Sequence, residues 1–147
     1  MPRNAVTYDE DFYAWSMEQV ELLRSGELSE IDAANIAEEL ESMGKNNRRE
    51  LGSRMAVLLM HLLKWRYQPN RRSPSWATTV RDQRDEIEAI LVDSPSLRPV
   101  VRDTLSAIYT RARRKAIGET GLPEATFPAD CPFTPDQILA EDFLPEG

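Results

Sequence analysis

Residues 55–63 constrain the fold of this chain more than any other stretch, because every position except His61 is apolar. A helix that is hydrophobic around its whole circumference has to be covered by neighbours on most faces. Apolar residues at helical spacing continue on both sides of this stretch, and Pro69 ends the helix. We therefore predict a central helix over residues 48–67, from Arg48 to Tyr67, surrounded by other helices in an all-α fold.

Two further helices are predicted before the central one. Ser25-Gly26 ends the first, and Gly44 can end the second. The apolar residues of the second helix recur every three or four positions and are expected to form one buried face: Ala33, Ile36, Ala37, Leu40 and Met43. Arg48 and Arg49 are unfavourable at the positive end of a helix dipole, so a kinked continuation of the second helix into the central one stays open.

Two long helices and a short one are predicted after the central helix. Ser73, as a cap, begins a helix that runs to about Val92, and the next helix ends at Gly121. A full capping box, Thr134-Pro135-Asp136-Gln137, then begins a short helix near the end of the chain.

The length of 147 residues suits one domain with a sizeable core, so no cofactor is needed to hold the fold together. We expect a single helical domain over residues 1–147, a bundle of five main helices plus the short C-terminal helix. Apolar residues recur every few positions in the Pro-rich tail, residues 121–147, which we expect to pack on the bundle.

Charge is divided unevenly along the chain. Residues 1–47 carry 3 Lys and Arg against 11 Asp and Glu, a net charge of -8, whereas residues 48–116 carry 15 against 7, a net charge of +8. Residues 117–147 have 7 acids and no Lys or Arg. We favour acidic ends that fold over a basic centre; the alternative is a basic centre that faces an anionic partner.

No stretch approaches the roughly 20 apolar residues that span a bilayer, and no apolar leader segment follows residues 1–4. The lone Cys131 cannot form an internal disulfide and belongs to no Cys/His cluster with metal spacing. These features predict a cytoplasmic protein that contacts no membrane, with Cys131 as a small, partly buried residue.

A polar stripe is predicted along one flank of the central helix. On a helical wheel Arg54, His61 and Gln68 lie nearly in line, with Glu50 close by. His61 is a candidate ligand or general base, although we favour a packed histidine tied by a hydrogen bond to a neighbouring Glu or Gln. Gln83 falls in the apolar seam of the next helix and needs a partner there, which we expect the stripe to provide.

Basic and aromatic residues alternate around the turn that follows the central helix. The candidate binding residues are Trp65, Arg66, Tyr67, Arg71, Arg72 and Trp76. Arginines pair with phosphates and aromatic rings stack on bases, so this corner is suited to single-stranded nucleic acid. The alternative, which we favour, is core tryptophans flanked by arginines that pair with the acidic first 47 residues.

Acidic pairs on two helices offer a third possibility. Glu38 and Glu41 share one helix face, and so do Asp82 and Asp85. Two such pairs on facing helices hold Mg²⁺ in some phosphohydrolases, while a diphosphate substrate completes the coordination. In a chain with 25 acids we favour solvated helix faces, and no metal is predicted.

Several longer motifs resemble a known family. They are Tyr8 to Trp15, Ile36 to Gly44, His61 to Trp65, Gln68-Pro69, Ser75-Trp76, Pro95-Ser96-Leu97, Cys131-Pro132 and Gln137-Ile138-Leu139. Together they resemble the bacterial family known as domain of unknown function family twenty-nine. The resemblance covers almost the whole chain and implies a small helical protein of bacteria, cyanobacteria and proteobacteria included. It implies no activity and no catalytic residues.

The preferred functional hypothesis is therefore a non-catalytic protein-interaction or regulatory module, with an unknown protein partner or self-association. The alternative is nucleic-acid binding at the basic aromatic corner. A Mg²⁺-dependent nucleotide phosphohydrolase is the third hypothesis.

Overall fold

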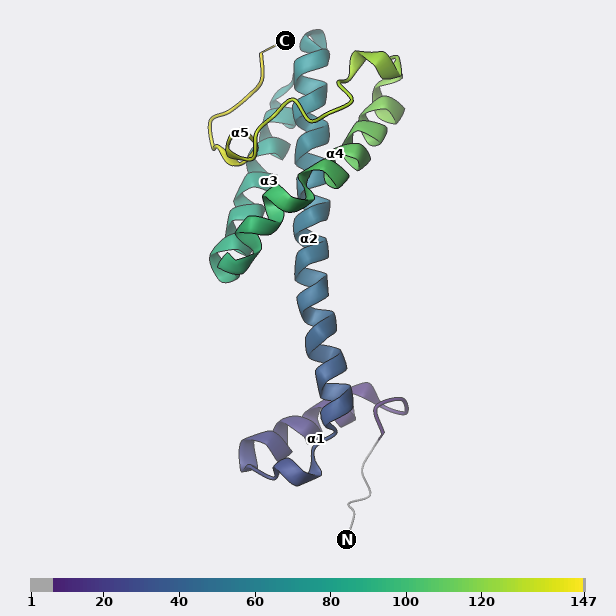
Figure 1. Ribbon diagram of the computed structural model, residues 1–147, viewed down its shortest axis with the longest axis vertical. Helices are drawn as coiled ribbons and strands as arrows, with labels where there is room; N and C mark the ends of the chain where they lie inside the picture. The colour runs from purple at the N-terminus through teal and green to yellow at the C-terminus, as the bar shows by residue number, and fades with distance from the viewer. Residues whose placement is uncertain (1–6, 147) are drawn as a thin grey trace. The chain divides into compact units, whose positions relative to one another are not determined.

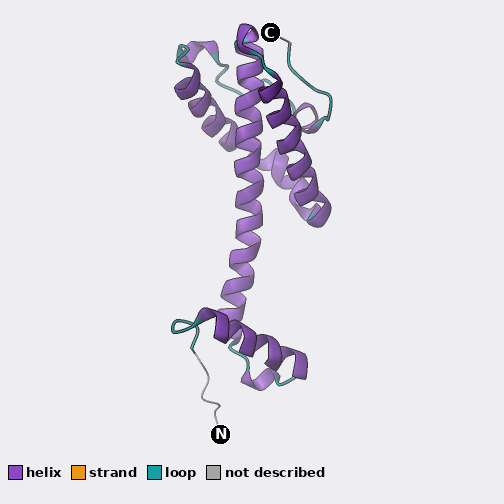
Figure 2. Ribbon diagram, turned by 180° about the vertical axis from the view of Figure 1, so that it is seen from behind, coloured by secondary structure: helices purple, strands orange, loops and turns teal. Residues whose placement is uncertain are grey.

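The computed structural model describes residues 7–146, and the expectation about residues 1–4 lies outside that range. Within it the fold is all-α, as predicted, with no strand (Figures 1 and 2). No helix in residues 7–146 combines the length and apolarity that a membrane crossing requires. The helices are α1 (Phe12–Ser25), α2 (Ala33–Tyr67), α3 (Pro74–Asp93), α4 (Arg98–Thr120) and α5 (Pro135–Leu139), joined by short 3-10 turns.

The predicted second and central helices are one continuous helix, α2, of 35 residues. The predicted stop at Gly44 and the predicted start at Arg48 are therefore wrong, and the continuation of the second helix, which the sequence left open, is what the structure has. Four long helices plus the short α5 replace the expected five plus one. Gly44 lacks the positive φ of a helix-ending glycine, which Gly26 and Gly121 both have. Continuation also removes the conflict between Arg48 and a helix N-terminus, because Arg48 lies in mid-helix.

Two compact units make up the chain, one ending at Asn46 and the other beginning at Asn47. We describe each by itself, and the single domain of the sequence analysis stays a prediction. In the second unit, α3, α4 and α5 surround the C-terminal part of α2 (Figure 1). The predicted burial of this part is confirmed, since the following side chains have none of their surface exposed: Met55, Ala56, Leu58, Leu59, Leu62 and Leu63.

The N-terminal unit has a small core around Trp15 and Leu22 of α1. Asp32, just before α2, joins the two helices, because its Oδ2 accepts a hydrogen bond from Trp15 Nε1 at 3.0 Å. Its backbone N–H donates to the side chain of Gln19, which is buried, at 2.7 Å. Hydrogen bonds from Asn35 and Trp15 lower the pKa of the Asp32 carboxyl.

The predicted buried face of the second helix is largely exposed, which corrects the sequence analysis. Ile36 is half-buried, but Ala33 and Ala37 are exposed, and Leu40 and Met43 are each 63% exposed. From Leu40 to Asn46 every residue is exposed, so nothing in the N-terminal unit covers this part of α2. The amphipathic spacing is present, but its apolar side has no neighbour within that unit.

The continuity of α2 at Gly44 predicts the effect of a substitution there. A Cβ at Gly44 would meet no atom within 4 Å, and the backbone is helical, so Gly44→Ala should raise the free energy of unfolding by roughly 0.5–1 kcal/mol. The matched control is Gly121→Ala, where φ is +68° and alanine should instead lower stability by about 1 kcal/mol. Urea unfolding with far-ultraviolet circular dichroism measures both; destabilisation by Gly44→Ala would show that the helix ends there.

Candidate functional site

The polar stripe of α2 reaches α3 through Arg54. Its Nε donates to Glu50 Oε1 at 3.1 Å, its Nη1 donates to Gln83 Oε1 at 3.4 Å, and its Nη2 lies 3.8 Å from Glu86 Oε2. The prediction that this stripe provides the partner of Gln83 is thus confirmed. Glu50 and Glu86 are about half exposed, so solvent screens these ion pairs and they contribute little to stability.

His61 does not take part in the Arg54 cluster. Its Nδ1 lies 2.9 Å from the backbone carbonyl oxygen of Val57, one turn earlier in α2. A carbonyl only accepts, so Nδ1 carries the proton and donates. Burial lowers the pKa of His61 and outweighs the hydrogen bond to the Val57 carbonyl, which raises it. The ring is therefore neutral near pH 7, with Nε2 left as an acceptor. The hydrogen bond is to a carbonyl oxygen, not to the Glu or Gln that we expected.

Gln68, the third member of the stripe, directly follows the last residue of α2. Its backbone N–H donates to Lys64 O at 2.9 Å and prolongs the helical hydrogen-bond pattern by one residue. Arg54, His61 and Gln68 of the predicted stripe therefore have three different sets of contacts and do not form one site.

The aromatic rings of the predicted corner are covered by the protein's own cations. Lys64 Nζ lies 4.7 Å from the centre of the Trp76 ring, and Arg72 Cζ lies 5.1 Å from that of Trp65. Arg66 Cζ lies 5.4 Å from the Tyr67 ring. Trp65, Tyr67 and Trp76 are all half-buried. A base that stacked on Trp65 or Trp76 would have to displace the cation already there.

Arg72 is directed into the protein and away from solvent. Its Nε donates to the carbonyl oxygen of Trp65 at 2.7 Å, and its Nη2 is buried without a hydrogen-bond partner in residues 7–146. Arg71, by contrast, is exposed. The structure thus pairs Arg72 with Trp65 and Lys64 with Trp76, and nucleic-acid binding at this corner stays a prediction.

The two acidic pairs belong to different units of the chain. Glu38 and Glu41 lie in the N-terminal unit, where Glu41 pairs with Lys45 at 2.7 Å, and Asp82 and Asp85 are exposed on α3 of the second unit. No cluster of three or more His, Cys, Asp or Glu side chains in residues 7–146 has an arrangement suited to a metal ion. The phosphohydrolase stays an untested prediction.

Arg84 is a buried cation that the sequence analysis missed. It is 6% exposed, and its guanidinium donates to three carbonyl oxygens around the end of α5: Ile138 O at 2.8 Å, Gln137 O at 3.3 Å and Glu141 O at 3.4 Å. The last carbonyls of a helix lack partners within it, so a cation is stabilising there. Burial lowers the pKa of Arg84.

The buried seam of α3 consists of Val80, Arg84, Ile87 and Leu91. The prediction that Gln83 lies in this seam is therefore wrong, and Gln83 is half-buried beside it.

Two residues of α4 hold the irregular part of the tail in the same way. Arg113 Nη2 donates to Glu124 O at 2.9 Å and to Phe127 O at 3.2 Å. The Tyr109 hydroxyl donates to Pro128 O at 2.6 Å. Phe127, Phe133 and Ile138 are buried in the core of the second unit, so residues 121–146 complete that core and do not extend into solvent.

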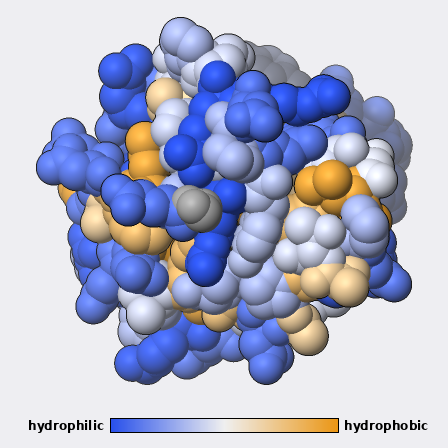
Figure 3. Space-filling view, turned by 90° about the horizontal axis from the view of Figure 1, so that it is seen from above, coloured by the Kyte–Doolittle hydropathy of each residue, from blue (hydrophilic) through white to orange (hydrophobic). Residues whose placement is uncertain are grey.

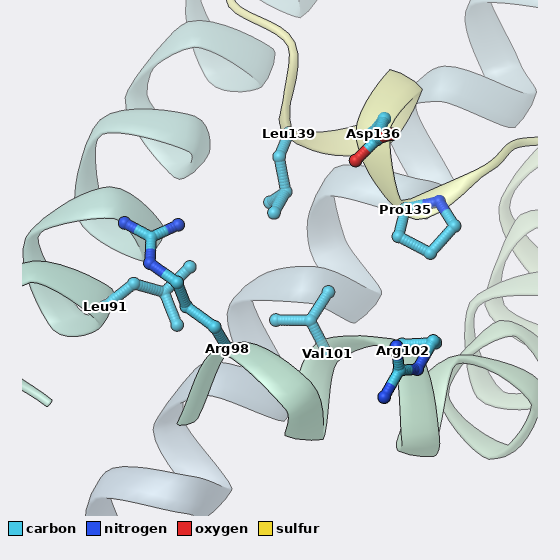
Figure 4. Close-up of a pocket in the computed structure, with 7 residues that line it drawn as sticks. All are labelled: Leu91, Arg98, Val101, Arg102, Pro135, Asp136 and Leu139. Atoms are coloured by element: carbon cyan, nitrogen blue, oxygen red, sulfur yellow. The ribbon is translucent and has the colours of Figure 1, made fainter. Parts of the chain in front are cut away.

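A pocket of about 470 Å³ opens between α3, α4 and α5 (Figure 4). Its lining consists of Leu91, Arg98, Val101, Arg102, Pro135, Asp136 and Leu139. Figure 4 shows Leu139 directed from α5 toward α4, with Arg98 beside the opening. Both arginines already have acidic partners, since Arg98 lies 3.0 Å from Glu88 and Arg102 lies 3.5 Å from Asp103. The pocket therefore has an apolar floor but no free buried charge that selects a ligand.

Exposed apolar side chains concentrate in the N-terminal unit. Of the eight large apolar side chains in residues 7–146 that are exposed, seven belong to it, and we call these the N-terminal apolar residues: Phe12, Tyr13, Met17, Leu23, Leu28, Leu40 and Met43. The eighth, Val92, lies in the second unit. Seen from the end where α2 finishes, the second unit is mainly hydrophilic, with small separate apolar areas (Figure 3).

The apolar side chains of α1 form one broad arc that the unit covers only in part. Trp15 and Leu22, at one edge of the arc, are buried. Phe12, Tyr13, Met17 and Leu23 fall within the adjoining stretch of roughly 140° of the helix circumference and are exposed, although the ring of Phe12 also packs 5.7 Å from that of Trp15. A shallow open depression on the exposed side is lined by Met17, Glu18, Val20, Glu21, Arg24 and Ser25. The apolar arc of α1 is therefore wider than the surface that the chain itself covers.

The contacts of Arg84 predict a large loss of stability on its removal. Arg84→Met should lower the free energy of unfolding by about 3 kcal/mol, because three carbonyl oxygens lose a charged donor in a buried place. Arg81→Met, at an exposed arginine of the same helix, is the matched control and should change stability by less than about 0.5 kcal/mol. Urea unfolding and limited proteolysis of the tail measure the effect; equal losses in both variants would contradict the role of Arg84.

The lowered pKa of His61 predicts a pH dependence of stability. In the unfolded chain His61 binds a proton near its ordinary pKa of about 6.5, whereas in the folded protein the pKa of His61 is lower. The free energy of unfolding therefore decreases as the pH falls below about 6.5. Urea unfolding from about pH 7.5 to about pH 5.5 should show this loss, and His61→Gln should lack that part of it. Because His61 is the sole histidine, its NMR titration is unambiguous; a folded pKa at or above 6.5 would refute the burial argument.

Neither the search among curated proteins nor the search among solved structures gave a match. A protein-family model, described as Domain of unknown function DUF29, matches residues 7–144, which is nearly the whole chain and includes both units. The resemblance seen in the sequence motifs is thereby confirmed, and the chain belongs to the DUF29 family.

Proposed function

We propose that this protein is a non-catalytic interaction module, of a binding or regulatory kind, and that its N-terminal unit docks a partner protein. The observation that carries the proposal is the uncovered apolar side of α2. Leu40 and Met43 have the helical spacing of a buried face, yet each is 63% exposed. Apolar side chains gathered on one part of a surface commonly mark a binding site.

The outer side of α1 supports the same proposal. Phe12, Tyr13, Met17 and Leu23 are all more than two-fifths exposed, although α1 already buries Trp15 and Leu22 at the edge of the same apolar arc. Exposed aromatic and methionine side chains are enriched in protein interfaces. Both helices of the unit thus present apolar side chains that the unit itself leaves uncovered.

The polar groups of the second unit support a structural role for that part of the chain. Arg84 and Arg113 donate to backbone carbonyls of the tail, and His61 donates to the carbonyl of its own helix. Lys64 and Arg72 cover tryptophan rings. Each of these candidate functional side chains is engaged in holding the second unit together.

We further propose a bacterial and cytoplasmic protein. The bacterial assignment rests on the resemblance of its motifs to the family. The cytoplasmic one rests on the lone cysteine: Cys131 is half-buried, and burial raises the pKa of its thiol, which keeps it protonated and unreactive. A reducing compartment suits such a residue.

Co-purification with matched variants tests the interaction. Tagged full-length chain, the double variant Leu40→Ser/Met43→Ser, and the control Val92→Ser are expressed in the source organism and compared by quantitative mass spectrometry. The wild type and Val92→Ser should retain the same partner, and the double variant should retain it at least about tenfold less, because two interface side chains contribute more than 1.4 kcal/mol together. A partner that all three retain equally, or no partner on the wild type, would refute the proposal.

A further inference from the structure

We infer that the partner presents a basic amphipathic helix, and that this helix comes from a different protein and not from a second copy of this chain. The inference rests on the proposed function and names the chemistry of its partner. It combines the charge of the N-terminal unit, the helical spacing of its exposed apolar residues and the composition of the second unit.

Charge is the first step of the argument. Residues 1–47 have a net charge of -8, and acidic residues flank the exposed apolar ones. At about 100° per residue, Glu39 lies on one side of the stripe formed by Leu40 and Met43, and Glu41 lies on the other. On α1, Glu18 and Glu21 line the depression that contains Met17. The rim is mainly acidic, although Arg24 lines the same depression and Lys45 pairs with Glu41. An excess of one sign around apolar anchors favours a partner of the opposite sign.

Helix geometry is the second step. Ile36, Leu40 and Met43 are separated by four and three positions, which forms a ridge along α2. A partner helix packs against such a ridge with its own apolar residues at positions i, i+3 or i+4 and i+7. Because every residue from Leu40 to Asn46 is exposed, the partner displaces no side chain of the N-terminal unit when it binds.

Charge favours a different protein over a second copy of this chain. A symmetric pairing through the N-terminal unit would place a net charge of -8 against another of -8. Residues 48–116 of a second copy have the right charge, +8, but in the described part of the second unit Val92 is the only large apolar side chain that is exposed. The exposed basic side chains nearest to Leu40 and Met43 are Lys45, Arg48 and Arg49 of α2, so antiparallel pairing of α2 with a second copy is the competing outcome that the self-association measurement tests.

Three synthetic peptides of 18 residues test the inference against the full-length chain. The first has leucines at helical spacing and lysines elsewhere; the second replaces every lysine by glutamate; the third has the composition of the first in an order that destroys the helical spacing. Calorimetry at about 150 mM salt should show that the first peptide binds at least tenfold more tightly than the other two. Its affinity should fall when the salt is raised, and it should fall at least tenfold with Leu40→Ser/Met43→Ser but not with Val92→Ser.

The possible results separate the inference from the proposed function. If the glutamate peptide binds as tightly as the lysine peptide, and binding still depends on Leu40 and Met43, the charge argument is wrong while the interaction surface stands. Equal binding of the reordered lysine peptide would refute the helical geometry. If no peptide binds, or if Val92→Ser weakens binding as much as the double variant, the inference is wrong, and the co-purification experiment then decides the proposed function by itself.

Self-association is measured on the same preparations by size-exclusion chromatography with light scattering. The inference predicts a monomer at tens of micromolar for the wild type and for Leu40→Ser/Met43→Ser. A wild-type dimer that the double variant converts to a monomer would show that a second copy occupies the surface, and would overturn the assignment to a different protein.

Discussion

Seven side chains of α2 between Leu51 and Leu63 have at most 1% of their surface exposed, so water has to be kept from every side of this part of the helix except the flank of Ser53, Arg54, Val57 and His61. Two long helices, α3 and α4, do not complete that cover. Phe127, Phe133 and Ile138 from the tail are buried in the same core. The need to cover most of the circumference of α2 thus explains why a Pro-rich segment with little regular structure is part of the folded unit.

An irregular segment in contact with a core has a second requirement, because its backbone carbonyls have no helix or sheet to pair them. Arg84, Arg113 and Tyr109 meet this requirement from α3 and α4. An arginine suits the task, since its planar guanidinium donates to two or three oxygens at once, and its charge strengthens each hydrogen bond. The side chains that most resemble catalytic groups by burial and charge are, in this protein, donors to the backbone.

Local signals in the sequence were sufficient for much of the fold. The apolar run through Leu59 predicted the buried part of α2, and Ser73 and Thr134 begin helices with the expected cap hydrogen bonds. Gly26 and Gly121 end helices with a positive φ, as predicted. These features depend on residues within one or two turns of each other, which is why a single sequence reveals them.

The errors came from contacts that sequence spacing does not contain. Arg84 and Ile138 are 54 positions apart, so the cation in the seam of α3 could not be matched to its carbonyls, and the neighbouring Gln83 was placed in the seam instead. The spacing of Leu40 and Met43 correctly indicated an apolar side, but periodicity does not say which molecule covers it. For this part of α2, the spacing identified the apolar side chains but predicted burial where the structure shows exposure.

The exposure of α2 changes along its length, and this has a consequence for the stability of a single helix. Around Leu59 the helix opens only when the core of the second unit opens. From Leu40 to Asn46, by contrast, the helix is stabilised by little more than its own hydrogen bonds, and Gly44 in its middle weakens it. One secondary-structure element thus contains a gradient from global to local unfolding. A partner bound at Leu40 and Met43 would add its binding free energy at the weak end of that gradient and would stabilise the helical state there.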